Sequence, residues 1–214
     1  MKIHIITLFP DLIDAYARES ILGRAQQKKI LSITSHQIRD FVNNKWGKVD
    51  ERPYGGGPGM VLQAMPILKA AAHIQKKAKG KTKILIPSPA GVQLTNAYGK
   101  SLTRYDNLII ICGRYEGIDA RVKKILKAEE VSVGPYVLTG GELPALAIAD
   151  VIARQIPGVL GKFESLEENR IASSEIYSRP EVLTYKGKKY RVPKVLLSGH
   201  HGNIDAWKQK KKKH

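Results

Sequence analysis

The stretch Val133–Leu146, "VGPYVLTGGELPAL", decides how this sequence is interpreted. Most of its side chains are apolar, which predicts that it is buried. Its glycines and prolines are nevertheless spaced too closely for a strand or a helix to run through it. Buried irregular backbone is costly, because its amides and carbonyls must find partners other than water. The question is therefore what this backbone pairs with.

Around this stretch, short apolar segments alternate with segments of helical periodicity. Strands are predicted at 2–9, 31–38, 82–89, 107–113 and 129–133, and helices at 11–28, 66–79, 95–103, 118–126 and 142–154. Two of the strands are apolar on both faces, which is typical of a parallel sheet covered by helices. The pattern predicts an α/β domain over residues 1–160.

The composition changes after this domain. Residues 161–176 are polar and acidic, without a clear apolar period, which indicates an interdomain linker. Residues 177–214 contain short apolar groups between prolines and end in "KQKKKKH". We expect them to form a small, helical, basic domain.

The charge of the chain indicates a polyanionic partner. With 36 Lys and Arg against 19 Asp and Glu, the net charge is +17. Such a balance favours nucleic acid as partner, although a lysine-rich surface without one is the alternative. The single cysteine, Cys112, excludes an internal disulfide and fits a reducing cytoplasm. No apolar run is long enough to span a membrane, and the N-terminus is interpreted as a strand and a helix rather than a signal peptide.

Three predicted strands end in turns rich in glycine or proline. These turns are "PSPAG", "GRYEGID" and the opening stretch. Ligands of open α/β sheets bind beyond the carboxyl ends of the strands, and glycine lets a ligand approach the backbone closely. The turns together favour a pocket lined by main-chain groups. Because neither GxGxxG nor GxxxxGK[ST] occurs, the ligand is not expected to be a dinucleotide held by its pyrophosphate.

At these residues the sequence resembles a known family. The segments "ICGRYEGIDARV", "SVGPYVLTGGELPAL" and "RQIPGVLG", with "RPYGGGPGM" upstream and "YSRPEV" and "VPKVLLSGHH" downstream, resemble those of the bacterial tRNA (guanine-N1)-methyltransferases. The resemblance implies a deep trefoil-knotted parallel sheet flanked by helices, with a small helical C-terminal domain. It also implies a homodimer with the active site at the subunit interface. The implied reaction transfers a methyl group from S-adenosylmethionine to N1 of guanine 37, next to the tRNA anticodon.

The resemblance also assigns the cofactor-binding residues. In the family, the opening stretch wraps the adenosine part of the cofactor, so that adenine and other knot strands pair with its backbone. The positions implied are Pro89, Gly113, Tyr115, Glu116, Val133, Gly134, Pro135, Tyr136, Val137, Leu138, Gly140, Gly141 and Pro144. Pro135 stands where the family usually has Asp, so any contact of that carboxylate is lost.

Of the catalytic positions implied by the resemblance, one matches the family and one differs from it. Arg154 matches the arginine that supports negative charge on O6 of guanine; without the resemblance it would be interpreted as a surface ion-pair residue. The family's general base is an Asp in the linker, and Asn169 occupies that position. An amide cannot accept the N1 proton at neutral pH. The hypothesis is that Glu168 takes the proton, with Glu116 as the second candidate. An acidic solvated loop with an Asn helix cap is the alternative interpretation of "EEN".

The expected tRNA-phosphate contacts are basic residues of the C-terminal domain. They are Arg179, Lys186, Lys188, Lys189, Arg191, Lys194 and Lys208. No protein metal site is predicted, and any Mg²⁺ requirement would not involve a dedicated site. Neither a membrane nor DNA is expected as a partner. Two alternatives to the methyltransferase stay open: a tRNA-binding relative that lost efficient catalysis with its linker Asp, and a knotted methyltransferase acting on RNA ribose.

Overall fold

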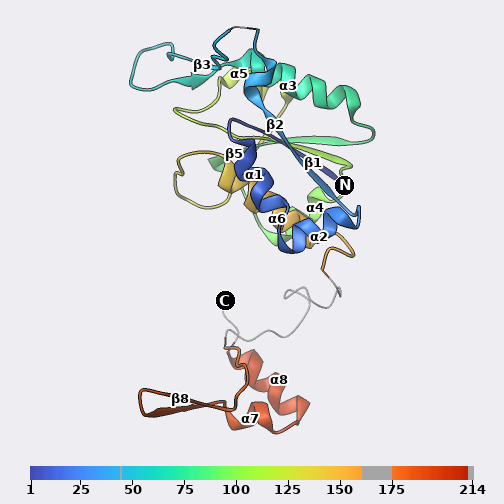
Figure 1. The fold of residues 1–214 in the computed structure, drawn as a ribbon, viewed down its shortest axis with the longest axis vertical. Coiled ribbons are helices and arrows are strands. Elements are labelled where there is room, and N and C mark those ends of the chain that lie inside the picture. Colours follow the sequence, from blue (N-terminus) through green and yellow to red (C-terminus); the bar gives the residue numbers. More distant parts are fainter. Residues whose placement is uncertain (44, 161–174, 212–214) are drawn as a thin grey trace. The chain divides into compact units, whose positions relative to one another are not determined.

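The computed structural model describes residues 1–43, 45–160 and 175–211, which belong to two compact units, Met1–Leu160 and Gly161–His214. The first unit is built on a five-stranded, entirely parallel sheet with the order β2-β1-β6-β5-β7 (Figure 1). Its strands are β1 (Lys2–Thr7), β2 (Ser32–Gln37), β5 (Thr82–Gln93), β6 (Asn107–Ile111) and β7 (Glu129–Ser132). A short antiparallel ribbon joins β3 (Asp50–Glu51) to β4 (Val61–Leu62).

Helices cover both faces of the sheet, and each face has its own apolar core (Figure 1). One face is covered by α1 (Pro10–Ala17), α2 (Ser20–Gln27), α4 (Asn96–Leu102) and α6 (Glu142–Arg154). The other is covered by the 3-10 helix η1 (Ile38–Phe41), α3 (Ala64–Lys77) and α5 (Ala120–Leu126).

The central strand β6 shows why the sheet forms. All five of its residues are buried, and successive side chains point to opposite faces of a strand. Leu108 and Ile110 accordingly belong to the core on the α6 side, while Ile109 and Ile111 belong to the core on the α3 side. The predicted parallel α/β sheet is thereby confirmed.

The helix predicted at 11–28 is wrong as one element, because the chain breaks it into α1 and α2. Ser20 has a φ of 49°, outside the right-handed helical region, and Gly23 packs against the carbonyl of Arg18. A Cβ at position 23 would lie 2.0 Å from that oxygen. Apolar periodicity did not detect the break because buried residues such as Ile13 and Leu22 lie on both sides of it.

The C-terminal unit is not purely helical, so the prediction of a small helical domain over residues 177–214 is corrected. It contains an antiparallel hairpin of β8 (Val182–Tyr185) and β9 (Lys188–Arg191), followed by α7 (Lys194–Leu197) and α8 (His201–Lys210). The turn residues Lys186 and Gly187 have φ values of 50° and 75°. The sequence contains a hairpin signal at this place, because a two-residue turn with glycine, Lys186-Gly187, lies between two short β-forming runs.

In the part of the chain that the structure describes, no helix is both long enough and apolar enough to cross a membrane.

Candidate active site

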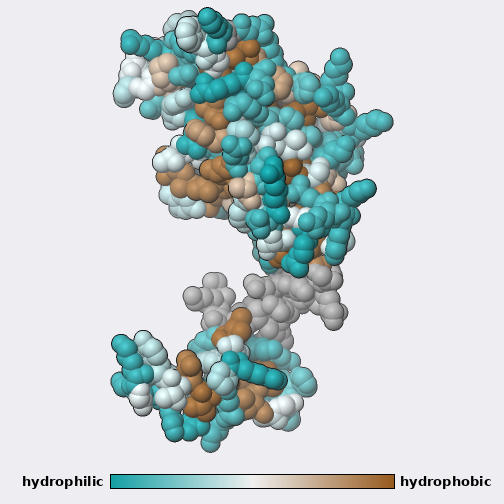
Figure 2. Space-filling model, viewed as in Figure 1, coloured by the Kyte–Doolittle hydropathy of each residue, from teal (hydrophilic) through white to brown (hydrophobic). Residues whose placement is uncertain are grey.

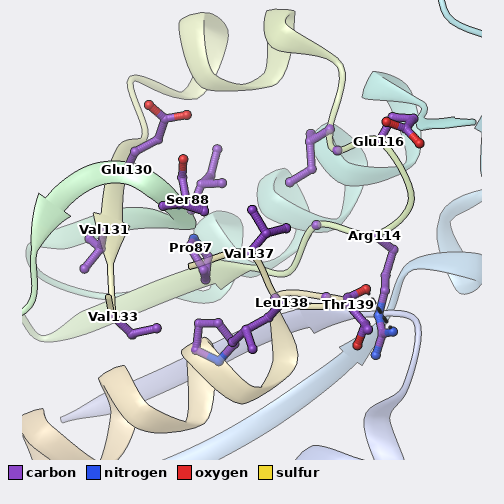
Figure 3. A pocket seen from close by; sticks show the side chains of 18 of the residues that line it. Pro87, Ser88, Arg114, Glu116, Glu130, Val131, Val133, Val137, Leu138 and Thr139 are labelled. Carbon is purple, nitrogen blue, oxygen red and sulfur yellow. Dashed lines mark hydrogen bonds between the residues drawn. The ribbon is translucent and has the colours of Figure 1, made fainter. Parts of the chain in front are cut away.

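A cavity of about 570 Å³ lies at the carboxyl end of the sheet (Figure 3). It is bordered by three segments: the irregular part of β5 around Pro87–Pro89, the loop 113–120 after β6, and the loop 133–141 between β7 and α6. This is the edge where open α/β sheets bind ligands. Every residue that the resemblance assigns to the cofactor lines this cavity, with the exception of Pro135. Their contact with a cofactor stays a prediction.

The loop 133–141 is less buried than its composition suggested. Val137 is 86% exposed, Tyr136 52% and Leu138 41%, so the prediction of a fully buried stretch is wrong for the isolated chain. In Figure 2 a hydrophobic area lies where Figure 1 draws the gold loop that precedes α6. Within the opening stretch, Gly134 and the residues Gly141, Glu142 and 144–146 are buried as expected. Apolar side chains exposed at a cavity rim are available to a ligand or to another chain.

The backbone of this loop offers hydrogen-bonding groups to the cavity. Among the described residues, no acceptor pairs with the main-chain amides of Val137, Leu138, Thr139 and Gly140. The preceding turn is instead closed by the chain itself: Tyr136 N donates to the Gly134 carbonyl at 2.9 Å. Free amides beside exposed apolar side chains suit a flat heterocycle that needs both stacking and edge hydrogen bonds.

A buried ionic network lies behind the loop, and sequence analysis did not find it. Glu142, whose side chain is 1% exposed, accepts a hydrogen bond from Thr7 Oγ1 at 2.8 Å and pairs with Arg114 Nε at 2.9 Å. Arg114 also donates to the Thr139 carbonyl at 3.3 Å. The available signal was that Arg114 and Glu142 each lie beside glycines and close to apolar residues, in "CGRYEG" and "GGELP". Burial next to Glu142 raises the pKa of the Cys112 thiol well above its usual value, which keeps this thiol protonated.

The predicted residue Glu116 lines the same cavity from the loop that contains Arg114. Its amide donates to the Met60 carbonyl at 2.9 Å, so the glycine-rich loop 55–60 runs beside it. A Cβ at Gly59 would lie 2.5 Å from Glu116 Oε1, and glycine therefore lets the two loops touch. Next to it, the Arg121 guanidinium lowers the pKa of Asp119 by hydrogen bonding. Glu116 is exposed and belongs to the lining of the cavity, and Figure 3 shows its side chain at the edge of the site.

The structure does not bring Arg154 to the cavity. It is the last residue of the 13-residue helix α6, whose first turn lines the cavity at Pro144. With a rise of about 1.5 Å per residue, the helix separates Arg154 from Glu142 by roughly 18 Å. Glu168 and Asn169 lie outside the described residues.

The C-terminal unit presents its basic residues on the surface. Six of the expected contacts are exposed and Lys208 is partly buried. They are Arg179, Lys186, Lys188, Lys189, Arg191, Lys194 and, on α8, Lys208. The rings of Tyr177 and Trp207 lie 6.4 Å apart, so both contribute to local packing of this unit. Among residues 1–43, 45–160 and 175–211, no group of three His, Cys, Asp or Glu side chains has the arrangement of a metal site.

The fold and the cavity define the class of α/β proteins with a cavity lined by glycine-rich loops at the carboxyl edge of a parallel sheet, the edge where such proteins bind small ligands. Residues 1–214 match the model of the family described as tRNA (Guanine-1)-methyltransferase TrmD, and the chain belongs to this family. The resemblance drawn from the sequence is thereby confirmed.

Individual relatives match along nearly the whole chain. A protein of Desulforamulus reducens named tRNA (guanine-N(1)-)-methyltransferase is 45% identical, over 98% of this chain and 83% of its own length. Proteins of the same name from Lachnospira eligens and Photobacterium profundum are each 43% identical. These alignments cover 99% and 98% of this chain, and 89% and 84% of the relatives.

Proposed function

We propose that this protein transfers the methyl group of S-adenosylmethionine to N1 of guanine 37 in tRNA. The observation that carries the proposal is the cavity at the carboxyl edge of the sheet, together with the family to which the chain belongs. Relatives named tRNA (guanine-N(1)-)-methyltransferase align with nearly all of its residues.

The cavity suits the adenosine part of this methyl donor. Its volume of about 570 Å³ is within the usual range for cofactor sites. The free amides of Val137–Gly140 are donors for the edge of adenine, and the exposed side chains of Tyr136 and Leu138 offer apolar contact. When bound, S-adenosylmethionine supplies an electrophilic methyl group on a sulfonium. The protein contributes mainly orientation and control of charge.

The proton on guanine N1 needs an acceptor, and the chain offers two carboxylates. Glu168 is adjacent to Asn169, the position where the family has its Asp, and Glu168 takes the proton in the proposed mechanism. Glu116 is the second candidate, supported by its place in the cavity wall. Asn169 orients guanine by hydrogen bonds. Arg154 stabilises the negative charge that develops on O6.

The proposed assembly is a homodimer with its active site at the subunit interface. The separation of Arg154 from the cavity along α6 supports this, because a second copy is needed to bring the two ends of the helix to one site. Exposed apolar side chains on the packed helices α1 and α6, among them Leu12, Tyr16 and Leu143, also support it. The deep trefoil knot, formed where the loop 133–141 passes the loop 113–120, is part of the same proposal.

The C-terminal unit binds the tRNA backbone in this proposal. Its exposed lysines and arginines supply phosphate contacts, which are the usual source of affinity for nucleic acid. Mg²⁺ acts through the tRNA or the reaction rather than through a dedicated protein site. The buried single thiol of Cys112 suits the reducing cytoplasm, where tRNA is found.

Single-turnover methyl transfer tests the proposal. The wild type and the variants Asn169→Asp and Glu168→Gln are mixed with labelled S-adenosylmethionine and tRNA, and N1-methylguanine is quantified. We expect product from the wild type and a loss of about 10²–10⁴-fold in rate for Glu168→Gln, the range for a lost general base. Full turnover by Glu168→Gln would move the assignment to Glu116.

The amide of Asn169, at the position where the family has its Asp, supports one alternative function. A tRNA- and cofactor-binding protein without efficient catalysis would yield no product as wild type but would yield product after Asn169→Asp. That result would replace the proposed enzyme with a binding protein.

A further inference from the structure

We propose that Glu142 is a positioning residue: acting through Arg114, it holds the main chain of Thr139–Gly141 in the shape that binds the methyl donor. The inference rests on the proposed cofactor, and it adds a residue to which neither sequence analysis nor the comparisons gave a role.

The carboxylate of Glu142 has both oxygens engaged. Oε1 accepts from Thr7 Oγ1 at the carboxyl end of β1, and Oε2 accepts from Arg114 Nε in the loop after β6. Thr7 Oγ1 in turn accepts from the amide of Phe9 at 2.9 Å. A carboxylate this deeply buried is stable only when its charge is paired and its oxygens are hydrogen-bonded. The first turn of α6 is thus tied to the ends of two strands.

Arg114 transmits this constraint to the loop. Its Nη1 donates to the Thr139 carbonyl, its guanidinium lies 4.5 Å from the centre of the Phe9 ring, and a Cβ at Gly140 would lie 2.2 Å from its Nε. Figure 3 shows the Arg114 side chain beside Thr139. The charge pair, the ring contact and the carbonyl define one orientation of the guanidinium, and the loop backbone lies directly against it.

The segment Val137–Gly140 has few other restraints. Within the described chain, the bond from Arg114 to Thr139 is the one hydrogen bond made to this segment. The next restraint along the chain is the bond from the Gly141 amide to the Gly113 carbonyl, at 2.9 Å. The four free amides therefore depend on Arg114, and through it on Glu142, for their position. Ligand affinity falls when the groups that bind it must first be ordered.

Glu129 provides a matched control. Like Glu142, it is a carboxylate with one cationic and one hydroxyl partner, Lys83 and Tyr98, but it is only partly buried and does not line the cavity. If Glu142 only stabilised the fold, replacing either carboxylate by its amide would have the same kind of effect. A positioning role predicts that Glu142→Gln alone weakens binding.

The experiment measures the affinity of the full-length protein for S-adenosylhomocysteine by calorimetry, without tRNA. We expect Glu142→Gln to weaken binding at least tenfold, Arg114→Lys to have an intermediate effect, and Glu129→Gln to bind as the wild type does. In methyl transfer, the KM for S-adenosylmethionine should rise at least tenfold for Glu142→Gln, while kcat at saturation stays within threefold. Thermal unfolding of each variant establishes that it is folded.

Each other outcome overturns the inference in a distinct way. Wild-type affinity in folded Glu142→Gln, or a drop in kcat with unchanged KM, excludes the positioning role. Equal losses in Glu142→Gln and Glu129→Gln assign both carboxylates to stability alone. If Glu142→Gln does not fold, Arg114→Lys is used instead, because this variant leaves Glu142 a cationic partner. Its affinity for S-adenosylhomocysteine is then compared with that of Glu129→Gln. A wild type that does not bind S-adenosylhomocysteine overturns the proposed cofactor, and this inference with it.

Discussion

The two units of this protein are stabilised in different ways. The first has two extensive apolar cores, and strands such as β6 have every side chain buried. In the described part of the C-terminal unit, residues 175–211, no residue is buried. A hairpin, two short helices and surface pairs such as Lys211 with Glu175 form its structure instead.

This difference separates two kinds of binding. A cavity that fits one small molecule needs walls that do not move, and burial on both faces of the sheet provides them. A phosphate backbone is recognised by charges that need little burial, and the C-terminal unit presents such charges. Substitutions in the two units should therefore change different measurable quantities.

The largest expected difference is in stability. Ile110→Ala removes a fully buried side chain from the central strand and should lower the free energy of unfolding by about 2–5 kcal/mol. Leu183→Ala, at a site 56% exposed in β8, should change it by no more than about 0.5 kcal/mol. Urea denaturation of the full-length chain, followed by circular dichroism, measures both. Equal losses would show that the C-terminal unit is packed as tightly as the first.

The next largest effect concerns the cavity wall. In Gly141→Ala, the added Cβ would lie 2.7 Å from Cys112 Cα and 2.8 Å from Gly113 N, so the backbones of the two loops must separate. We expect the affinity for S-adenosylhomocysteine to fall by about tenfold or more, corresponding to the 1–3 kcal/mol typical of overpacking. Gly202→Ala is the control, because its Cβ meets nothing closer than 3.6 Å. Unchanged affinity in Gly141→Ala would mean that the loop adjusts freely.

A third prediction concerns the basic surface. The double variant Lys188→Ala/Lys189→Ala should weaken tRNA binding by about tenfold and reduce the slope of log K against log salt by up to about 2. Its affinity for S-adenosylhomocysteine should not change. Lys76→Ala/Lys77→Ala on α3 removes the same charge from the first unit and serves as the matched control. If both pairs weaken tRNA binding equally, net charge rather than the C-terminal unit determines affinity.

The smallest predicted effect is the pH dependence of the first unit. Burial, with smaller contributions from His36 and Lys2, lowers the pKa of His4 to about 4 from 6.5. Because the unfolded chain binds this proton more readily, stability should be lost as the pH falls from 6.5 to 4. His4 Nδ1 lies 3.1 Å from His36 Nε2, and burial also lowers the pKa of His36.

Since His4 is only half-buried, its contribution to this loss should be on the order of 1 kcal/mol. His4→Gln should flatten the profile of unfolding free energy between pH 6.5 and 4. His201→Gln, at an exposed site in the C-terminal unit, should leave it unchanged. A profile of His4→Gln that matches the wild type would assign the acid sensitivity to other groups.

Sequence alone was sufficient for the parallel sheet, because the apolar runs of β1, β5 and β6 reflect burial that acts on each strand separately. It also identified the turns that border the cavity, since glycine and proline turns after strands report local backbone requirements. The individual positions Gly113, Gly134 and Gly140, which line the cavity, were implied by the resemblance. Sequence alone did not detect the break between α1 and α2 or the β8–β9 hairpin. The break lies in an unbroken apolar period, and the hairpin signal at Lys186 and Gly187 was present but was not interpreted as a turn.

Only the tertiary structure determined how Thr7, Arg114 and Glu142 meet. These residues are far apart in the chain, and nothing in their own segments indicates that they pair with one another. Their association depends on β1 lying beside β6 and on α6 beginning next to both. The same holds for the exposure of Val137, which its apolar character alone predicted wrongly. Local patterns record the environment of one segment, whereas a buried ion pair or an open cavity depends on the distances between segments, which only folding sets.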